Sequence, residues 1–208
     1  IYDQAVNDPE TAMDLAEKEQ LRLLQLISEY MDAVRAARAA HSSLDSTATH
    51  NAFFILAPEV HSFLNDLVQQ NLAYQTSERL LNILNRQNLI VSLEENVYQL
   101  AQALAQARSD ALGRLVQSFV EGLDTILLTA VDAMESSDRS EVTLLIAITE
   151  DRGSLMEKIR NTYLANEKTL EAQDKPTLLY VTILFERIVW MLGRLGTLRR
   201  NEAQLLIS

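Results

Sequence analysis

The sequence of 208 residues contains no cysteine and very little glycine or proline. The absence of cysteine excludes disulfides, cysteine-ligated zinc and thiol catalysis, and the chain does not look like a disulfide-rich secreted scaffold. Five glycines and three prolines make up about 4% of the chain, where an average chain carries about 12%. Hairpins and strand-to-helix loops depend on these two residues, so an all-β or βαβ fold is nearly excluded.

Positive charge is also scarce. The chain has 18 Lys and Arg against 29 Asp and Glu, which gives a formal net charge of −11. Nucleic acid is therefore excluded as a partner, because its phosphates need Lys and Arg. No GxGxxG or GxxxxGKS pattern is present, and the glycines are scattered singly. We therefore expect no phosphate-cradling loop.

Long uninterrupted apolar runs are missing as well. The most apolar stretch, 177–193, contains Glu186 and Arg187 near its middle. Each of these charges would cost about 2.5–3.5 kcal/mol inside a bilayer, so a buried helix is expected there instead of a membrane span. The chain opens at Ile1 without an initiator methionine or a signal peptide and ends on an apolar tail. We expect it to be a piece of a longer protein.

Apolar residues recur at spacings of three and four in six segments, which predicts six long helices and an all-α fold. Asp8-Pro9-Glu10 opens the first with a capping residue, a proline at the first helical position and an acid near the positive end of the helix dipole. Pro58 predicts a kink or a restart at Ala57. The polar run 150–153 marks a weak point in the fifth helix. The expected helices span about 9–38, 50–72, 78–107, 110–131, 141–165 and 177–198.

An internal echo divides these helices into two sets of three. Residues 93–100 and 185–192 share the pattern apolar-Glu-x-x-Val-aromatic-x-Leu at an offset of 92 residues. Two amphipathic helices can also match by chance, but each segment closes a set of three helices of similar length. Long helices with short polar joins pack as antiparallel neighbours. The sequence thus predicts two sequential three-helix bundles, 1–108 and 109–208.

Short sequence motifs in the two sets of helices resemble those of a known protein family. Phe185-Glu186-Arg187-Ile188 stands where PhoU-like proteins carry a leucine-glutamate-arginine-isoleucine core in the third helix of a repeat. Pro9-Glu10-Thr11-Ala12, Asn85-Arg86-Gln87 and Leu93-Glu94-Glu95 resemble the tail that follows the membrane domain in bacterial sodium/phosphate cotransporter-like proteins. Those tails are themselves PhoU-like. The resemblance implies a cytoplasmic, regulatory helical domain of a membrane protein.

The chain departs from the family at the residues that bind metal clusters. In the family the glutamate is followed four residues later by an aspartate, and this spacing places both carboxylates on one helical face. Here Glu94 is followed by Tyr98, and Glu186 by Trp190. An aromatic side chain cannot replace a carboxylate ligand, so metal binding is not transferred to this chain. We expect Glu94, Tyr98, Glu186, Arg187 and Trp190 to be structural.

The remaining candidate site residues have simpler explanations. His50 and His61 would lie about 16 Å apart on one helix, so they cannot share a metal, and all three histidines (with His41) are expected to be solvated or capping. Ser42, His41 and Asp45 lack the elbow and glycine-rich oxyanion loop of a catalytic triad. Four acids lie close together at the junction between the fourth and fifth expected helices, where we expect a solvated helix end: Asp132, Glu135, Asp138 and Glu141.

Three arginines, Arg194, Arg199 and Arg200, cluster near the end of the last helix. One interpretation is a favourable interaction with the negative end of the helix dipole. The alternative is a patch that binds an anion or an anionic lipid headgroup. Both interpretations stay open at the level of sequence.

The function predicted from these observations is non-catalytic. We expect a regulatory or interaction domain without a cofactor, at the cytoplasmic face of the inner membrane. Its partner would be the membrane domain of the same polypeptide or a second copy of itself. The alternative is a helical-bundle ligand-sensing module of a bacterial receptor. A ferritin-type metal enzyme is a weaker rival, since it needs Glu-x-x-His pairs and the chain has none at that spacing.

Overall fold

The computed structural model describes residues 8–107, 109–136, 138–150, 152–165 and 174–205. This part of the chain contains seven α-helices and no strand, which confirms the all-α prediction. The helices are α2 (Pro9–Ala39), α3 (Thr47–Val68), α4 (Tyr74–Gln106), α5 (Asp110–Glu135), α6 (Arg139–Thr149), α7 (Arg152–Ala165) and α8 (Asp174–Leu205).

The expected fifth helix is two helices, so the prediction of six is corrected to seven in the described chain. α6 ends at Thr149, and its C-cap residue Glu150 is extended, with φ −70° and ψ 153°. The residues from Glu150 to Gly153 include no apolar side chain that could hold the helix against the core, and α6 ends just before them. The second expected helix behaves in the opposite way. α3 continues through Pro58 without a restart, because Phe53, Ala57 and further apolar residues bind its inner face to the core.

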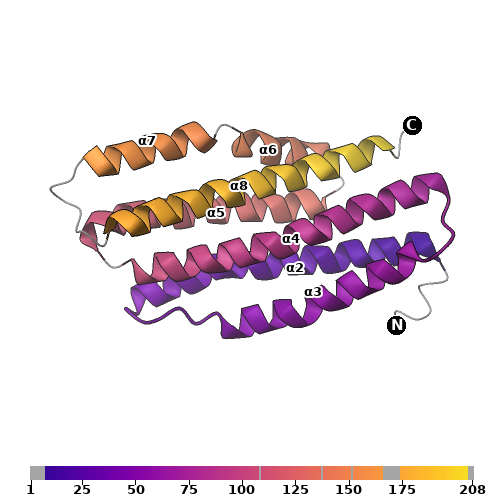
Figure 1. Cartoon of the computed structure of the whole chain (residues 1–208), viewed down its shortest axis with the longest axis horizontal. Helices are drawn as coiled ribbons and strands as arrows, with labels where there is room; N and C mark the ends of the chain where they lie inside the picture. The colour runs from indigo at the N-terminus through magenta and orange to yellow at the C-terminus, as the bar shows by residue number, and fades with distance from the viewer. Residues whose placement is uncertain (1–7, 108, 137, 151, 166–173, 206–208) are drawn as a thin grey trace.

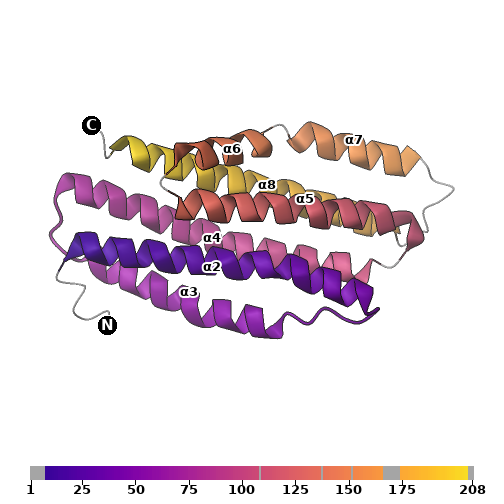
Figure 2. The same ribbon diagram turned by 180° about the vertical axis from the view of Figure 1, so that it is seen from behind.

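Four helices form the centre of the molecule, and three flank it (Figures 1 and 2). α2, α4, α5 and α8 pack against one another, with contacts between α2 and α4, α4 and α8, α2 and α5, and α5 and α8. α3 covers α2 and α4 on one side, while α6 and α7 cover α8 on the other. α4 and α8 run in opposite directions along the long axis, and the start of α2 lies at the same end as the end of α8 (Figure 1).

One buried apolar cluster runs through all of these helices. It crosses the predicted boundary at residue 108, because α2 packs against α5 and α4 against α8. Polar contacts join the same pairs: Arg35 on α2 pairs with Asp124 on α5, and Arg187 on α8 donates to Asn96 on α4 at 3.3 Å. The two sets, α2–α4 and α5–α8, therefore share a core.

The offset of 92 residues recurs in the burial of the first helix of each set. α2 and α5 contribute six pairs of buried residues at this offset: Gln20/Leu112, Leu23/Leu115, Leu24/Val116, Ile27/Phe119, Met31/Leu123 and Val34/Ile126. Tyr30 is an exception, since its equivalent at this offset is Gly122. The first set therefore has a buried phenol where the second has no side chain.

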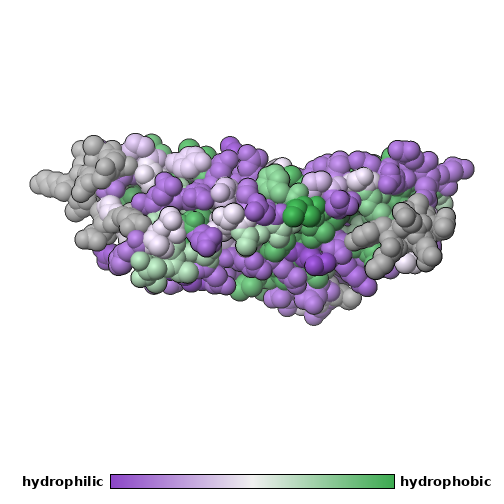
Figure 3. Space-filling model, turned by 90° about the horizontal axis from the view of Figure 1, so that it is seen from below, coloured by the Kyte–Doolittle hydropathy of each residue, from purple (hydrophilic) through white to green (hydrophobic). Residues whose placement is uncertain are grey.

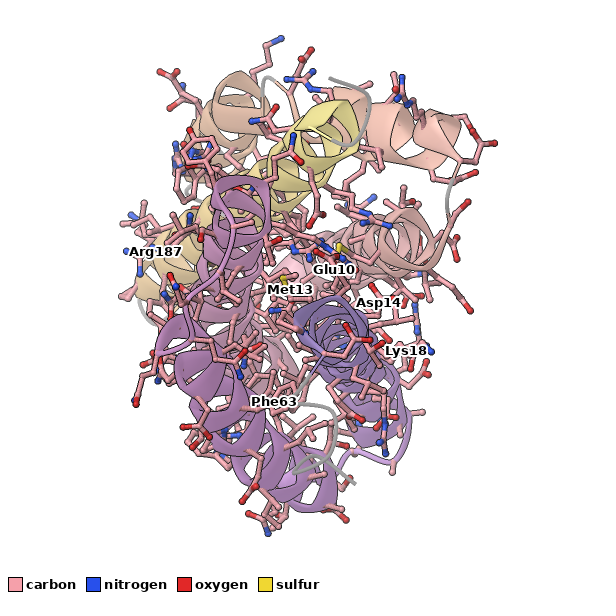
Figure 4. The ribbon with its side chains drawn as sticks, turned by 90° about the vertical axis from the view of Figure 1, so that its right-hand side faces the viewer. Glu10, Met13, Asp14, Lys18, Phe63 and Arg187 are labelled. Atoms are coloured by element: carbon pink, nitrogen blue, oxygen red, sulfur yellow. The ribbon has the colours of Figure 1, made fainter. Side chains whose placement is uncertain are left out.

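A buried ion-pair network closes the end of the molecule that Figure 4 faces. Arg86 on α4 is fully buried and donates to Glu202 on α8 at 2.8 Å and to Glu17 on α2 at 2.5 Å. Arg79, about two turns before Arg86 on α4, pairs with Glu10 at 2.7 Å and with Asp14 at 2.5 Å, the two acids that Figure 4 labels on α2. The network ties together α2, α4 and α8, which belong to different sets.

Candidate functional site

Glu94 is the most deeply buried acid among those that the sequence singles out. It lies on α4 with 2% of its surface exposed, on the side that faces α2 and α3. Its Oε1 accepts a hydrogen bond from the Tyr30 hydroxyl at 2.5 Å and lies 2.9 Å from Nδ1 of His50. An ionised carboxylate only accepts hydrogen bonds, so an ionised Glu94 would take this hydrogen bond from the tautomer of His50 that carries its proton on Nδ1. Three helices thus converge on one carboxylate oxygen.

This arrangement affects the ionisation of the Tyr30 phenol. Burial, together with the hydrogen bond to the Glu94 carboxylate, raises the pKa of the Tyr30 phenol well above its ordinary value. The hydroxyl therefore stays a donor throughout the physiological pH range. It keeps one hydrogen bond on Glu94 whatever the state of the imidazole.

Aromatic rings stack beside the carboxylate. The His50 ring lies parallel to Tyr98, with the ring centroids 4.2 Å apart, and packs at a tilt against Phe54 at 4.6 Å. Tyr98 also packs against Tyr30 at 5.7 Å. Glu94 and Tyr98 lie one turn apart on α4, and His50 and Phe54 lie one turn apart on α3. The packing of α3 against α4 therefore brings one pair of side chains into contact with the other.

This cluster opens into a groove of about 980 Å³ between α3 and α4. Glu94, His50 and Tyr98 line one part of it, and five apolar residues lie beside polar ones along the rest: Phe53, Phe54, Ala57, Pro58 and Val91. Glu95 and His61 are the other ionisable side chains of the lining, which contains no Lys or Arg among the described residues. Seen from below, the face over which α3 lies carries hydrophobic patches between hydrophilic ones (Figure 3). The groove therefore combines an apolar wall with negative charge, and its volume is that of a small-molecule site.

The second half arranges its equivalent residues differently. Glu186 is 42% exposed in its side chain and pairs with Arg160 of α7 at 3.4 Å. Trp190 is 66% exposed. Arg187 is exposed and donates to Asn96, as described above. Glu94 and Tyr98 thus belong to a buried cluster, whereas Glu186 and Trp190 lie at the surface.

The three arginines of α8 do not point in one direction. Arg199 donates to Glu202 at 3.2 Å and so joins the network around Arg86. Arg194 and Arg200 are exposed. At about 100° per residue, the three side chains leave the helix at least about 100° apart from one another. The anion patch stays a prediction, with Arg194 and Arg200 as its exposed cations.

The other candidates have structural positions. His41 has φ 51° and ends α2: its N–H bonds to Arg38 O, and that of Ser42 bonds to Ala37 O, the pattern of a Schellman cap. Asp138 caps α6 by accepting from Ser140 N at 2.9 Å, and this hydrogen bond lowers the pKa of its carboxyl. No group of three or more potential metal ligands occurs within the described residues. None of the helices described there is long and apolar enough to cross a membrane.

Sequence reasoning named Glu94 and Tyr98 but missed Tyr30, and it expected His50 to be solvated or capping. Tyr30 and His50 lie 64 and 44 residues before Glu94 along the chain. No local spacing connects them. Comparison with models of known protein families, with curated proteins and with solved structures finds no significant match. The resemblance to PhoU-like proteins therefore rests on the residues quoted in the sequence analysis.

Proposed function

We propose that this chain is a non-catalytic regulatory or interaction domain, the cytoplasmic PhoU-like tail of a sodium-dependent phosphate transporter. It would consist of two three-helix units, 1–108 and 109–208, in which α6 and α7 together take the place of the second helix of the latter unit. It would act at the cytoplasmic face of the inner membrane. Its partner would be the membrane domain of the same polypeptide. The observation that carries the proposal is an exposed stripe on α8.

The stripe consists of four large apolar residues and two cations: Leu179, Tyr180, Ile183, Arg187, Trp190 and Arg194. At about 100° per residue these six fall within about 100° of one another, and they extend over about 22 Å of helix. Trp190 is the most exposed of the stripe's apolar residues, with 66% of its surface exposed. Several large exposed apolar side chains on one helix face are typical of an interaction site.

Charge supports the membrane domain as the partner. The cytoplasmic loops of membrane proteins carry an excess of Lys and Arg. A chain with a net charge of −11 is attracted to such loops, whereas two copies of it repel each other. The stripe would supply the apolar contact, and the net negative charge of the chain would favour the encounter.

The test uses the membrane domain encoded in the same reading frame, reconstituted in nanodiscs, and measures its capture of the 208-residue chain. Trp190→Ala and Ile183→Ser should each weaken capture at least about tenfold, as expected for a central apolar contact. Phe54→Ala is the matched control, because Phe54 is 59% exposed but lies on α3. Equal capture of all variants, or a reading frame without membrane spans before Ile1, would refute the proposal. Concentration-dependent dimerisation through the stripe would assign it to a second copy instead.

The second candidate is a helical-bundle ligand-sensing module, and the groove between α3 and α4 favours it. A buried carboxylate, stacked aromatic rings and a volume of about 980 Å³ suit a small ligand. The two functions differ in gene architecture. Transmembrane helices on both sides of the chain would favour the sensor, and several spans upstream only would favour the transporter tail.

A further inference from the structure

We propose that the groove between α3 and α4 binds a small organic cation, with its ammonium group at Glu94 and its apolar body along the aromatic wall. This goes beyond the interaction proposed for α8, and it deepens the ligand-sensing alternative by naming the class of ligand. The groove lies on α3 and α4, and the stripe on α8, so each can be tested without the other.

The charge of the site is the first argument. Oε1 of Glu94 takes both hydrogen bonds, and among the described residues its other oxygen, Oε2, has no hydrogen-bond partner, although Glu94 lines the groove. The nearest nitrogen, Nδ1 of His50, belongs to a group that is charged only when protonated. A carboxylate that is 2% exposed and lacks a permanent cation beside it is costly to bury. A ligand ammonium at Oε2 would offset that cost.

The aromatic wall is the second argument. His50 stacks on Tyr98 and tilts against Phe54, and all three rings line the groove. The faces of tyrosine and phenylalanine attract cations through the ring quadrupole. A carboxylate next to such faces is the combination by which proteins hold ammonium groups. Phe54 is 59% exposed, so a ligand in the groove would also remove apolar surface from water.

The rest of the lining sets the other requirements. Phe53, Ala57, Pro58 and Val91 present apolar surface further along the groove, which suits a ring or an alkyl chain. Glu95 adds a second negative charge at the rim, and the described lining has no Lys or Arg to receive an anion. The site therefore favours a cation over a neutral analogue, and a neutral analogue over an anion.

Three probes of the same shape separate these contributions: 2-phenylethylammonium, 2-phenylethanol and phenylacetate. Binding to the 208-residue chain is measured by calorimetry and by NMR shift perturbation. The ammonium should bind at least about tenfold more tightly than the alcohol, the factor expected for one charge-assisted contact, and the carboxylate should not bind. Equal affinity for the ammonium and the alcohol would overturn the proposal.

Two variants locate the binding. Glu94→Gln removes the charge and keeps the shape, so it should abolish the preference for the ammonium and leave the weak binding of the alcohol. Glu186→Gln is the matched control at the equivalent position of the second half, outside the groove. If Glu94→Gln does not fold, as judged by circular dichroism, Phe54→Leu on the exposed wall takes its place and should weaken the ammonium several-fold. Ammonium binding that survives these substitutions unchanged would show that the groove is not the site.

Discussion

Equivalent residues in the two halves have opposite surroundings. Glu94 is enclosed by Tyr30 and His50, whereas the more exposed Glu186 pairs with the half-buried Arg160 of α7. The difference begins with Gly122, which stands where the first half has Tyr30 and so offers no hydroxyl. A repeated helical layout has thus kept one polar centre inside the first half and placed an exposed tryptophan on the second.

Glu202 provides a prediction about pH. Burial raises the pKa of its carboxyl, Arg86 and Arg199 oppose that shift, and the neighbouring Glu17 adds to it. An acid with a raised pKa in the folded state contributes stability below its ordinary pKa of 4.5 and loses this contribution as the pH rises through the raised value. The free energy of unfolding of the natural chain should therefore fall relative to that of Glu202→Gln as the pH increases above about 4.5.

Urea unfolding at a series of pH values between about 4 and 8 would measure this difference. Glu59→Gln, on the solvent-facing side of α3, is the control for the loss of one negative charge at the surface. The opposite trend, with the natural chain gaining stability over Glu202→Gln as the pH rises, would mean that the attraction of Arg86 outweighs burial.

At the level of elements, the contact between α6 and α8 depends on two glycines. A Cβ on Gly193 would lie 2.7 Å from Oγ1 of Thr149, which is itself held by hydrogen bonds to the carbonyls of Leu145 and Ile146. A Cβ on Gly196 would lie 3.1 Å from a side-chain carbon of Ile146. The close approach of these two helices therefore requires the absence of side chains.

Alanine substitutions at two helical glycines should have opposite effects. Gly113→Ala on α5 should raise the free energy of unfolding by about 0.5–1 kcal/mol, because alanine favours the helix and nothing lies within 4 Å of the new Cβ. Gly193→Ala should lower it by about 1–3 kcal/mol, since the clash with Thr149 exceeds that gain. Urea denaturation measures both. If Gly193→Ala stabilises the chain as Gly113→Ala does, α6 is free to move away from α8.

The elements were predictable to the extent that a local pattern marks them. Apolar spacing predicted the all-α fold, and the polar run after Thr149 marked the weak point where α6 and α7 separate. That spacing did not show that α3 continues through Pro58, because tertiary packing outweighs the lost hydrogen bond. Nor did it predict the partners of Glu94 or the contact between Gly193 and Thr149. Both depend on helices that are distant in the sequence and pack together in the fold.

At the scale of the whole molecule, the two sets of helices pack directly against each other. Residues from both sets make up the same buried cluster, and Arg86 on α4 holds Glu17 and Glu202 from opposite ends of the chain. A division into 1–108 and 109–208 therefore describes the order of the helices along the chain. Because the two sets share this core, we expect them to unfold together.

A cavity in the first half should destabilise the second half equally. Leu64→Ala on α3 removes a fully buried side chain, at a cost of about 2–5 kcal/mol. Because the core is shared, the fluorescence of Trp190, the single tryptophan of the chain, should shift to lower urea together with the helical signal in circular dichroism. Ile55→Ala, at an exposed position of the same helix, should shift neither signal appreciably. A Trp190 transition that stays in place while the helical signal splits would instead make 109–208 an independent folding unit.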